Sequence, residues 1–117
     1  MEANKNQINL ENFRVKDQQK GTISKVFTGR DRGKKVRNES KIDNLEKEFD
    51  TVEIIIPGNI YSINPSFFEE LFVNAVIKLG KVGFLEKFKF KSLGEYNYEK
   101  PLNEAIDRIL RSKTALD

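Results

Sequence analysis

The sequence contains no cysteine, no histidine and no tryptophan in 117 residues. Without cysteine there is no disulfide framework, no thiol nucleophile and no thiolate metal site. Without histidine the commonest metal ligand is missing, together with the side chain most often used for proton transfer near neutral pH. No nucleophile and base pair and no metal-ligand set can be assembled from the remaining residues. We therefore expect a protein that is not an enzyme, with no catalytic residue, metal or cofactor.

Long apolar runs are also missing. Residues 1–30 include no stretch of the length that a signal peptide or a membrane span requires. We therefore expect a cytoplasmic protein that does not contact a membrane. The net charge of +3 permits attraction to polyanions but does not by itself indicate nucleic-acid binding.

The residues that are present describe a globular chain. Hydrophobic residues make up 38% and charged residues 33% of the sequence, with nine phenylalanines to fill a core. A chain of this length supports one hydrophobic core. We expect a flexible N-terminus over residues 1–7 and a single domain over residues 8–117.

Hydrophobic periodicity predicts seven secondary-structure elements. In chain order they are edge strands over 8–15 and 22–28, a helix over 34–49, a strand over 51–56, a helix over 64–80, a strand over 84–90 and a helix from 101. We expect a loop over residues 29–33. The clearest strand has three consecutive isoleucines ended by Pro57, and the clearest helix has Asn64 as its cap, Pro65 in its first turn and Gly80 as its end.

Strands that alternate with helices favour parallel pairing and right-handed crossovers. We therefore expect a small α/β fold, with a mixed sheet of about four strands backed by about three helices.

A basic segment covers the start of the helix predicted over 34–49. Its members are Arg30, Arg32, Lys34, Lys35 and Arg37, with a glycine at positions 29 and 33. The segment could bind a phosphate or a nucleic-acid backbone, because arginine forks and helix amides favour oxyanions. It could equally be a solvated loop that keeps the protein soluble, since no phosphate-binding glycine motif is present.

The start of the helix predicted over 64–80 offers several contact residues. Ser66 lies in the first turn, where its hydroxyl can cap the helix or accept a phosphoryl group. Glu69 and Glu70 point in directions about 100° apart, which favours surface acids that compensate the helix dipole over a catalytic acid pair. The aromatic side chains of this region could meet a partner or a stacked base, or fill the core. They are Tyr61, Phe67, Tyr96 and Tyr98.

Residues 52–72, VEIIIPGNIYSINPSFFEELF, resemble the bacterial STAS-like domain family of unknown function, which is related in pattern to the anti-sigma factor antagonists. In that family a hydrophobic strand leads through a short loop to a Pro-Ser-Phe stretch and an acidic helix, preceded by a loop with Gly and Arg. The resemblance covers residues 29–79, about half of the chain.

The resemblance implies a regulatory protein-interaction module whose partner could be a histidine-kinase-like ATPase. It also implies that Ser66 matches the serine that such kinases phosphorylate. The expected binding or switch residues are Tyr61, Asn64, Ser66, Phe67 and Glu70. The alternative is a small nucleic-acid- or phosphate-ligand-binding protein that uses residues 29–37, for example in phage defence or counter-defence. A homodimer is compatible with either function.

Overall fold

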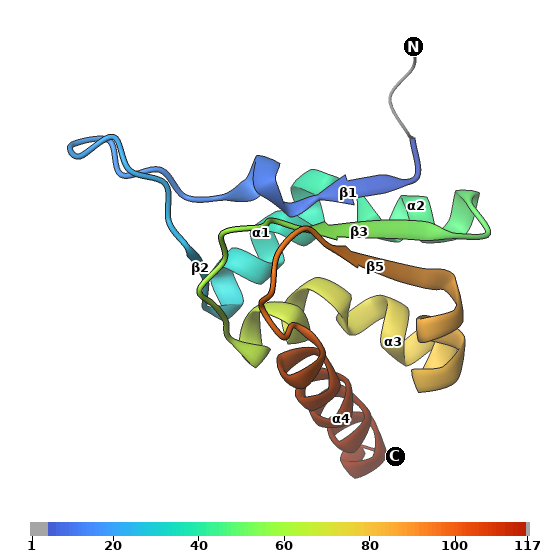
Figure 1. The fold of residues 1–117 in the computed structure, drawn as a ribbon. Helices are drawn as coiled ribbons and strands as arrows, with labels where there is room; N and C mark the ends of the chain where they lie inside the picture. Colours follow the sequence, from blue (N-terminus) through green and yellow to red (C-terminus); the bar gives the residue numbers. More distant parts are fainter. Residues whose placement is uncertain (1–4, 117) are drawn as a thin grey trace.

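The computed structural model describes residues 5–116, and their side chains as far as residue 113. The chain forms ten elements around a small parallel sheet (Figure 1). In order they are β1 (Gln7–Asn9), the 3-10 helix η1 (Leu10–Phe13), β2 (Val26–Phe27), α1 (Arg30–Ser40), α2 (Ile42–Glu48), β3 (Val52–Ile56), β4 (Ser62–Ile63), α3 (Pro65–Lys87), β5 (Phe88–Ser92) and α4 (Glu99–Leu116).

The main sheet has the order β1-β3-β5, with both pairs of strands parallel. In Figure 1 the three strands run side by side, with α1 and α2 behind them and α3 and α4 below. Side chains alternate between the two faces of a strand. Val52, Ile54 and Ile56 of β3 belong to the hydrophobic core, whereas Glu53 and Ile55 face the opposite side. The helices therefore back one face of the sheet, and on the other face Lys89 and Lys91 are exposed whereas Ile55 is buried.

The α/β class is confirmed, and so is the strand predicted over 51–56. The expectation of one mixed sheet of four strands was wrong, because the sequence forms two parallel sheets, β1-β3-β5 and β2-β4. Each pair of strands is joined by a crossover that contains at least one helix, and this geometry produces parallel neighbours. Strand β4 was missed because two residues carry no measurable period.

The strand predicted over 8–15 ends at Asn9. The Asn9 side chain accepts a hydrogen bond from the amide of Glu11 and so caps η1, a local bond that competes with strand pairing. Of the strand predicted over 22–28, only Val26–Phe27 pairs with another strand, β4. The chain between η1 and β2 forms a projecting hairpin, in which Lys16 bridges Ile23 and Asp17 caps the turn (Figure 1).

The helix predicted over 34–49 is two helices, α1 and α2, which meet at Lys41 in the left-handed conformation. The prediction of a loop over residues 29–33 was also wrong, because α1 begins at Arg30. A Cβ atom at Gly33 would overlap the carbonyl oxygen of Phe67 and lie 2.9 Å from the Cβ atom of Glu70. Gly33 is therefore the position where α1 packs closely against α3.

Asn64 caps α3 and Pro65 occupies its first turn, as predicted. Gly80 interrupts the helix with φ 73° and ψ 174°, but helical structure resumes and continues to Lys87. The strand predicted over 84–90 therefore begins four residues late, at Phe88. The last helix begins at Glu99, which leaves Pro101 in its first turn.

Phenylalanine rings fill the core along α3 and β5. Phe72 lies 5.1 Å from Phe84, 6.0 Å from Phe88 and 5.4 Å from Phe68, measured between ring centroids. All four side chains are buried. Helical structure at residue 84 is what brings Phe84 into this cluster, and it explains why the strand starts later than the alternation of residues 84–90 predicted.

Candidate functional site

The loop between β3 and α3 is held by long-range hydrogen bonds. Asn59 accepts a bond of 2.6 Å from the Arg14 guanidinium, and the Tyr61 amide donates to the carbonyl oxygen of Lys25 over 2.7 Å. The Asn64 amide donates to the carbonyl oxygen of Phe27. The loop is therefore fixed by the chain on either side of β2, even though its residues are mostly exposed.

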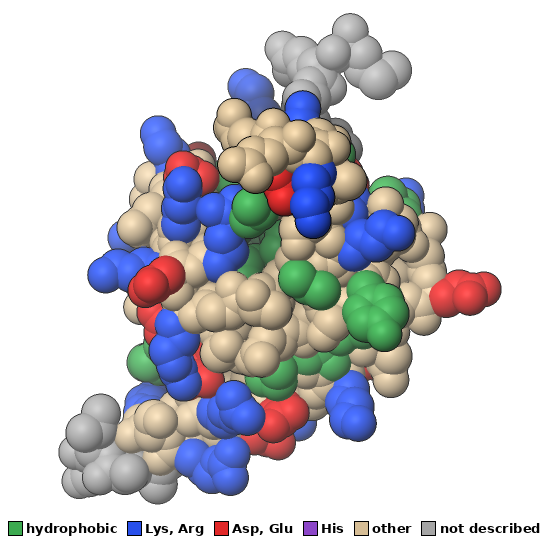
Figure 2. Space-filling model, turned by 90° about the vertical axis from the view of Figure 1, so that its left-hand side faces the viewer, with side chains coloured by type: hydrophobic (Ala, Val, Ile, Leu, Met, Phe, Trp, Pro, Cys, Tyr) green, Lys and Arg blue, Asp and Glu red, His purple; other side chains and the backbone are tan. Residues whose placement is uncertain are grey.

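Tyr61 projects from this fixed loop with 79% of its surface exposed. Val26, next to the Lys25 carbonyl that binds the Tyr61 amide, is exposed too, and so is Leu93, which lies beside Gly58. Figure 2 views this side of the molecule and shows hydrophobic side chains in the middle of the face with Lys and Arg around them. We call Val26, Tyr61 and Leu93 the apolar patch.

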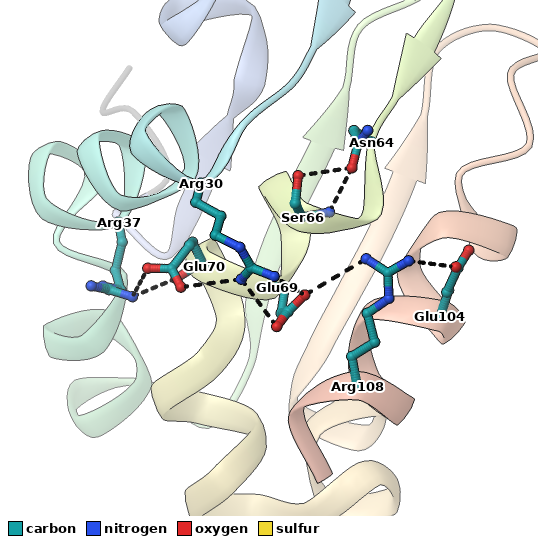
Figure 3. Close-up of polar contacts among 8 residues, drawn as sticks. All are labelled: Arg30, Arg37, Asn64, Ser66, Glu69, Glu70, Glu104 and Arg108. Carbon is teal, nitrogen blue, oxygen red and sulfur yellow. Dashed lines mark hydrogen bonds and ion pairs between the residues drawn. The ribbon is translucent and has the colours of Figure 1, made fainter. Parts of the chain in front are cut away.

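Asn64 and Ser66 form a cap at the start of α3 (Figure 3). The Asn64 side-chain oxygen Oδ1 accepts hydrogen bonds from the Ser66 amide at 2.9 Å and from the Ser66 hydroxyl at 2.8 Å. The capping side chain is therefore that of Asn64, and the Ser66 hydroxyl donates to it rather than capping a backbone amide itself. This role as a donor is one that a phosphorylated serine loses.

Glu69 and Glu70 join three helices through ion pairs. Glu69 lies 3.1 Å from Arg30 of α1 and 3.8 Å from Arg108 of α4. Glu70 lies 3.8 Å from Arg30 and 3.7 Å from Arg37. The hydrogen bond and the charge of Glu69 raise the pKa of Arg30, with a smaller contribution from Glu70. Figure 3 shows these residues as one chain of contacts, which continues from Arg108 to Glu104.

The basic segment is not arranged as an anion cradle. Arg30 and Arg37 contact glutamates, and the Arg32 guanidinium donates to the carbonyl oxygen of Phe13 at 2.8 Å. Lys34 and Lys35 are exposed on α1. Three of the five basic side chains are therefore engaged within the protein, and Arg30, which is 56% exposed, is also accessible from water.

Phe67 does not offer a surface to a partner. Its side chain is 0% exposed and its ring lies 5.0 Å from that of Phe27. The expectation of a contact residue is corrected here, and the core alternative applies. Phe67 is buried because α1 and β2 cover its side of α3.

Tyr96 and Tyr98 are half-buried. The Tyr96 hydroxyl accepts a hydrogen bond from the Ile63 amide at 3.0 Å and so anchors β4. Tyr98 stacks on Phe90 at 5.4 Å, and burial raises the pKa of its phenol, with a smaller contribution from Glu99. Of the four aromatic candidates, only Tyr61 is free to meet a partner.

Arg14, Arg108 and Glu104 were not predicted as members of this site. Arg14 reaches Asn59 across 45 positions, and no local spacing marks such a contact. The Arg108–Glu104 pair is recognisable as an i, i+4 pair, but its link to Glu69 depends on how α4 packs against α3.

Two searches of the described part of the chain give negative findings. Residues 5–116 contain no group of three or more acidic side chains placed to hold a metal ion. No helix within that range is long and apolar enough to cross a membrane.

Comparison with protein-family models, with curated proteins and with solved structures finds no match to this chain. The resemblance to the STAS-like family therefore stays a prediction from the residues quoted above.

Proposed function

We propose that this chain is a non-enzymatic regulatory module that binds a protein partner through the surface of residues 59–70. One observation supports this proposal more than any other. Tyr61 is the most exposed large hydrophobic side chain of the described residues, and it stands on a loop held by Arg14 and Lys25. An exposed tyrosine on a fixed loop loses little conformational entropy on binding, which is why aromatic side chains are enriched at interfaces.

Control by phosphorylation of Ser66 is the second part of the proposal. Transfer of a phosphoryl group from ATP would replace the hydroxyl proton and leave ADP. The phosphate carries about −1.5 to −2 charges and no donor at neutral pH. Its oxygens would oppose the Asn64 oxygen that now accepts from the Ser66 hydroxyl, so the cap would be lost.

The same phosphate would compete for the arginines of the ion-pair network. Glu69 and Glu70 lie three and four positions after Ser66, on the adjacent face of the helix. A phosphate one turn away would repel both carboxylates and attract Arg30, whose guanidinium is more than half exposed. Exchange of partners at Arg30 would change the charge of the surface at the start of α3. A histidine-kinase-like ATPase, as the family resemblance implies, is the partner that we propose for this switch.

An affinity pull-down from the source cell tests the proposal. The baits are the wild type, Tyr61→Ser, Ser66→Asp, Ser66→Ala and the control Val82→Ser, which removes a side chain 71% exposed on the far part of α3. We expect a protein that the wild type, Ser66→Ala and Val82→Ser retain and that Tyr61→Ser and Ser66→Asp lose.

Two results would contradict the proposal. One is a partner that Val82→Ser loses as readily as Tyr61→Ser. The other is recovery of nucleic acid alone, insensitive to Tyr61 and Ser66 and lost at high salt, which would favour the basic segment through Lys34 and Lys35.

A further inference from the structure

Strand β5 lies at an edge of the main sheet. Its inner side pairs with β3, from Val52 opposite Phe88 to Ile56 opposite Ser92, and no strand of the described chain pairs with its outer side. Five residues of parallel edge are therefore open to another chain.

The direction of the free backbone groups follows from one hydrogen bond. The amide of Leu93 donates to the carbonyl oxygen of Ile56, so Leu93 points its backbone groups towards β3. Successive residues of a strand point theirs to alternate sides. The backbone groups of Lys89 and Lys91 therefore face β3, as those of Leu93 do. The backbone groups of Phe90 and Ser92 face outward.

A cavity of about 220 Å³ lies beside this edge on the core face of the sheet. It is lined by Leu85, Phe90, Tyr98, Leu102, Glu99 and Asn103, among others. An added strand would lie about 4.8 Å from β5, and alternate side chains of that strand would point towards the cavity. The apolar part of the lining favours hydrophobic side chains at those positions.

The face of the sheet away from the helices carries basic side chains. Lys89 and Lys91 start on that face and both are exposed. The Lys89 ammonium donates a 3.4 Å hydrogen bond to the Leu85 carbonyl oxygen, so this side chain also lines the cavity. Glu53 is the cross-strand neighbour of Lys89, but its carboxylate accepts a 2.6 Å hydrogen bond from Gln7 on the far side of β3. The intervening side chains of an added strand would therefore meet two lysines on its nearest neighbour.

We infer that the outer edge of β5 binds an extended segment of a partner protein in which acidic residues alternate with apolar ones. The acidic residues would oppose Lys89 and Lys91, and the apolar residues would enter the cavity beside Phe90. Main-chain hydrogen bonds to Phe90 and Ser92 would add a fourth strand to the sheet.

A second copy of this chain fits the same edge poorly. Two β5 strands paired edge to edge would place Lys89 and Lys91 of one copy across from those of the other. Like charges opposite one another destabilise a strand pair. The lysines thus discourage self-association and select an acidic strand.

Fluorescence anisotropy with synthetic peptides tests the inference. The probe is a labelled nine-residue peptide in which Glu alternates with Val, and the control peptide has the same composition with its Glu residues grouped. We expect saturable binding of the alternating peptide and weaker binding of the grouped one. The Lys89→Glu, Lys91→Glu double variant should bind the alternating peptide about tenfold less tightly, from the loss of two exposed charge pairs and the repulsion that replaces them. The matched double variant Lys34→Glu, Lys35→Glu on α1 should bind it as the wild type does.

Two further peptides test the strand geometry. One is N-methylated at every Glu and the other at every Val, so that each loses the amides of one edge. Pairing with β5 uses one edge, so one of the two should bind and the other should not. Any of three results would overturn the inference. They are no binding of the alternating peptide, equal binding of both methylated peptides, and equal loss of affinity in the two double lysine variants. A dimer in sedimentation that the alternating peptide does not dissociate would overturn it too.

Discussion

Glu46, Glu69 and Glu70 each lie between two basic side chains, and a comparison of Glu46 with Glu69 separates two roles of such a carboxylate. Glu46 of α2 is 5% exposed and lies 2.9 Å from Lys78 and 3.2 Å from Lys87. Those lysines stand on the two sides of the Gly80 kink, so Glu46 ties both parts of α3 to α2. Glu69 lies between Arg30 and Arg108, whose side chains are 56% and 38% exposed.

The difference lies in what else could bind the basic groups. Around Glu46 the carboxylate is buried, and removing it would leave Lys87 without its partner in a mostly buried place. Around Glu69 the arginines reach water and can change partners at little cost. The first arrangement stabilises the fold, and the second makes a surface that a new charge at Ser66 can rearrange.

The largest expected effect lies in the aromatic core. Phe72→Ala removes the ring that contacts Phe68, Phe84 and Phe88. We expect the free energy of unfolding to fall by about 3–5 kcal/mol, because a buried ring is replaced by a cavity. Urea unfolding followed by circular dichroism measures it, with the exposed Val82→Ala as control. If Phe72→Ala lowered the free energy of unfolding by less than Val82→Ala does, the assignment of Phe72 to the centre of the core would be contradicted.

Gly33→Ala tests the contact that positions α1 beside Glu69 and Glu70. Alanine would favour the helix by about 1 kcal/mol, but its Cβ atom would overlap the Phe67 carbonyl oxygen. We expect a net loss of about 1–2 kcal/mol in the free energy of unfolding, because the clash outweighs the propensity. Lys34→Ala, one position along on the exposed face, should change it by less than about 0.5 kcal/mol. A Gly33→Ala protein more stable than the wild type would show that the helices do not meet there.

Glu46→Gln tests the buried carboxylate. Burial alone would raise the pKa of Glu46, but the hydrogen bonds and charges of Lys78 and Lys87 outweigh it and lower the pKa below its ordinary value of 4.5. The ion pairs therefore contribute their full stability above pH 4.5 and lose it as the pH falls through the lower, folded-state value. We expect a loss of about 1–2 kcal/mol at neutral pH and a flatter decline of stability with acid. Unfolding curves between pH 7 and pH 3 check both, and a decline as steep as that of the wild type would contradict the assignment.

Glu69→Gln should have the smallest effect on stability. We expect a change within about 0.5 kcal/mol that shrinks further at high salt, because the two arginines that pair with Glu69 reach water even though Glu69 itself is 14% exposed. Thermal unfolding at low and high salt measures it beside Glu46→Gln. A loss equal to that of Glu46→Gln would remove the distinction between the two carboxylates.

Local signals in the sequence predicted those parts of the fold that depend on neighbouring residues. The β-branched run ending at Pro57 gave β3, and the Asn64–Pro65 pair gave the start of α3. Strands β2 and β4 have two residues each, and their pairing depends on where a projecting hairpin returns to the body. The break at Lys41 has no glycine or proline to mark it, so the sequence reads as one helix.

The candidate site divides in the same way. The cap formed by Asn64 and the place of Ser66 in the first turn follow from the order of residues around a helix start. The sequence left open whether Tyr61 is exposed, and the structure shows that it is. The ion pair between Arg30 and Glu69 could not be predicted in this way, because the two residues lie 39 positions apart and meet only when α1 packs on α3. The burial of Phe67 depends on the same contact. The sequence therefore left open whether the basic segment and Phe67 face a partner, and the contact between α1 and α3 decides both.

Site-specific crosslinking in the source cell tests the proposed surface most directly. A photoreactive phenylalanine analogue replaces Tyr61 in one protein and Val82 in a matched protein. Val82 is also a strongly exposed hydrophobic residue. The proposal predicts one discrete protein adduct from position 61, weakened by Ser66→Asp and missing from position 82. Equal adducts from both positions, or an adduct at position 61 that Ser66→Asp leaves unchanged, would contradict it.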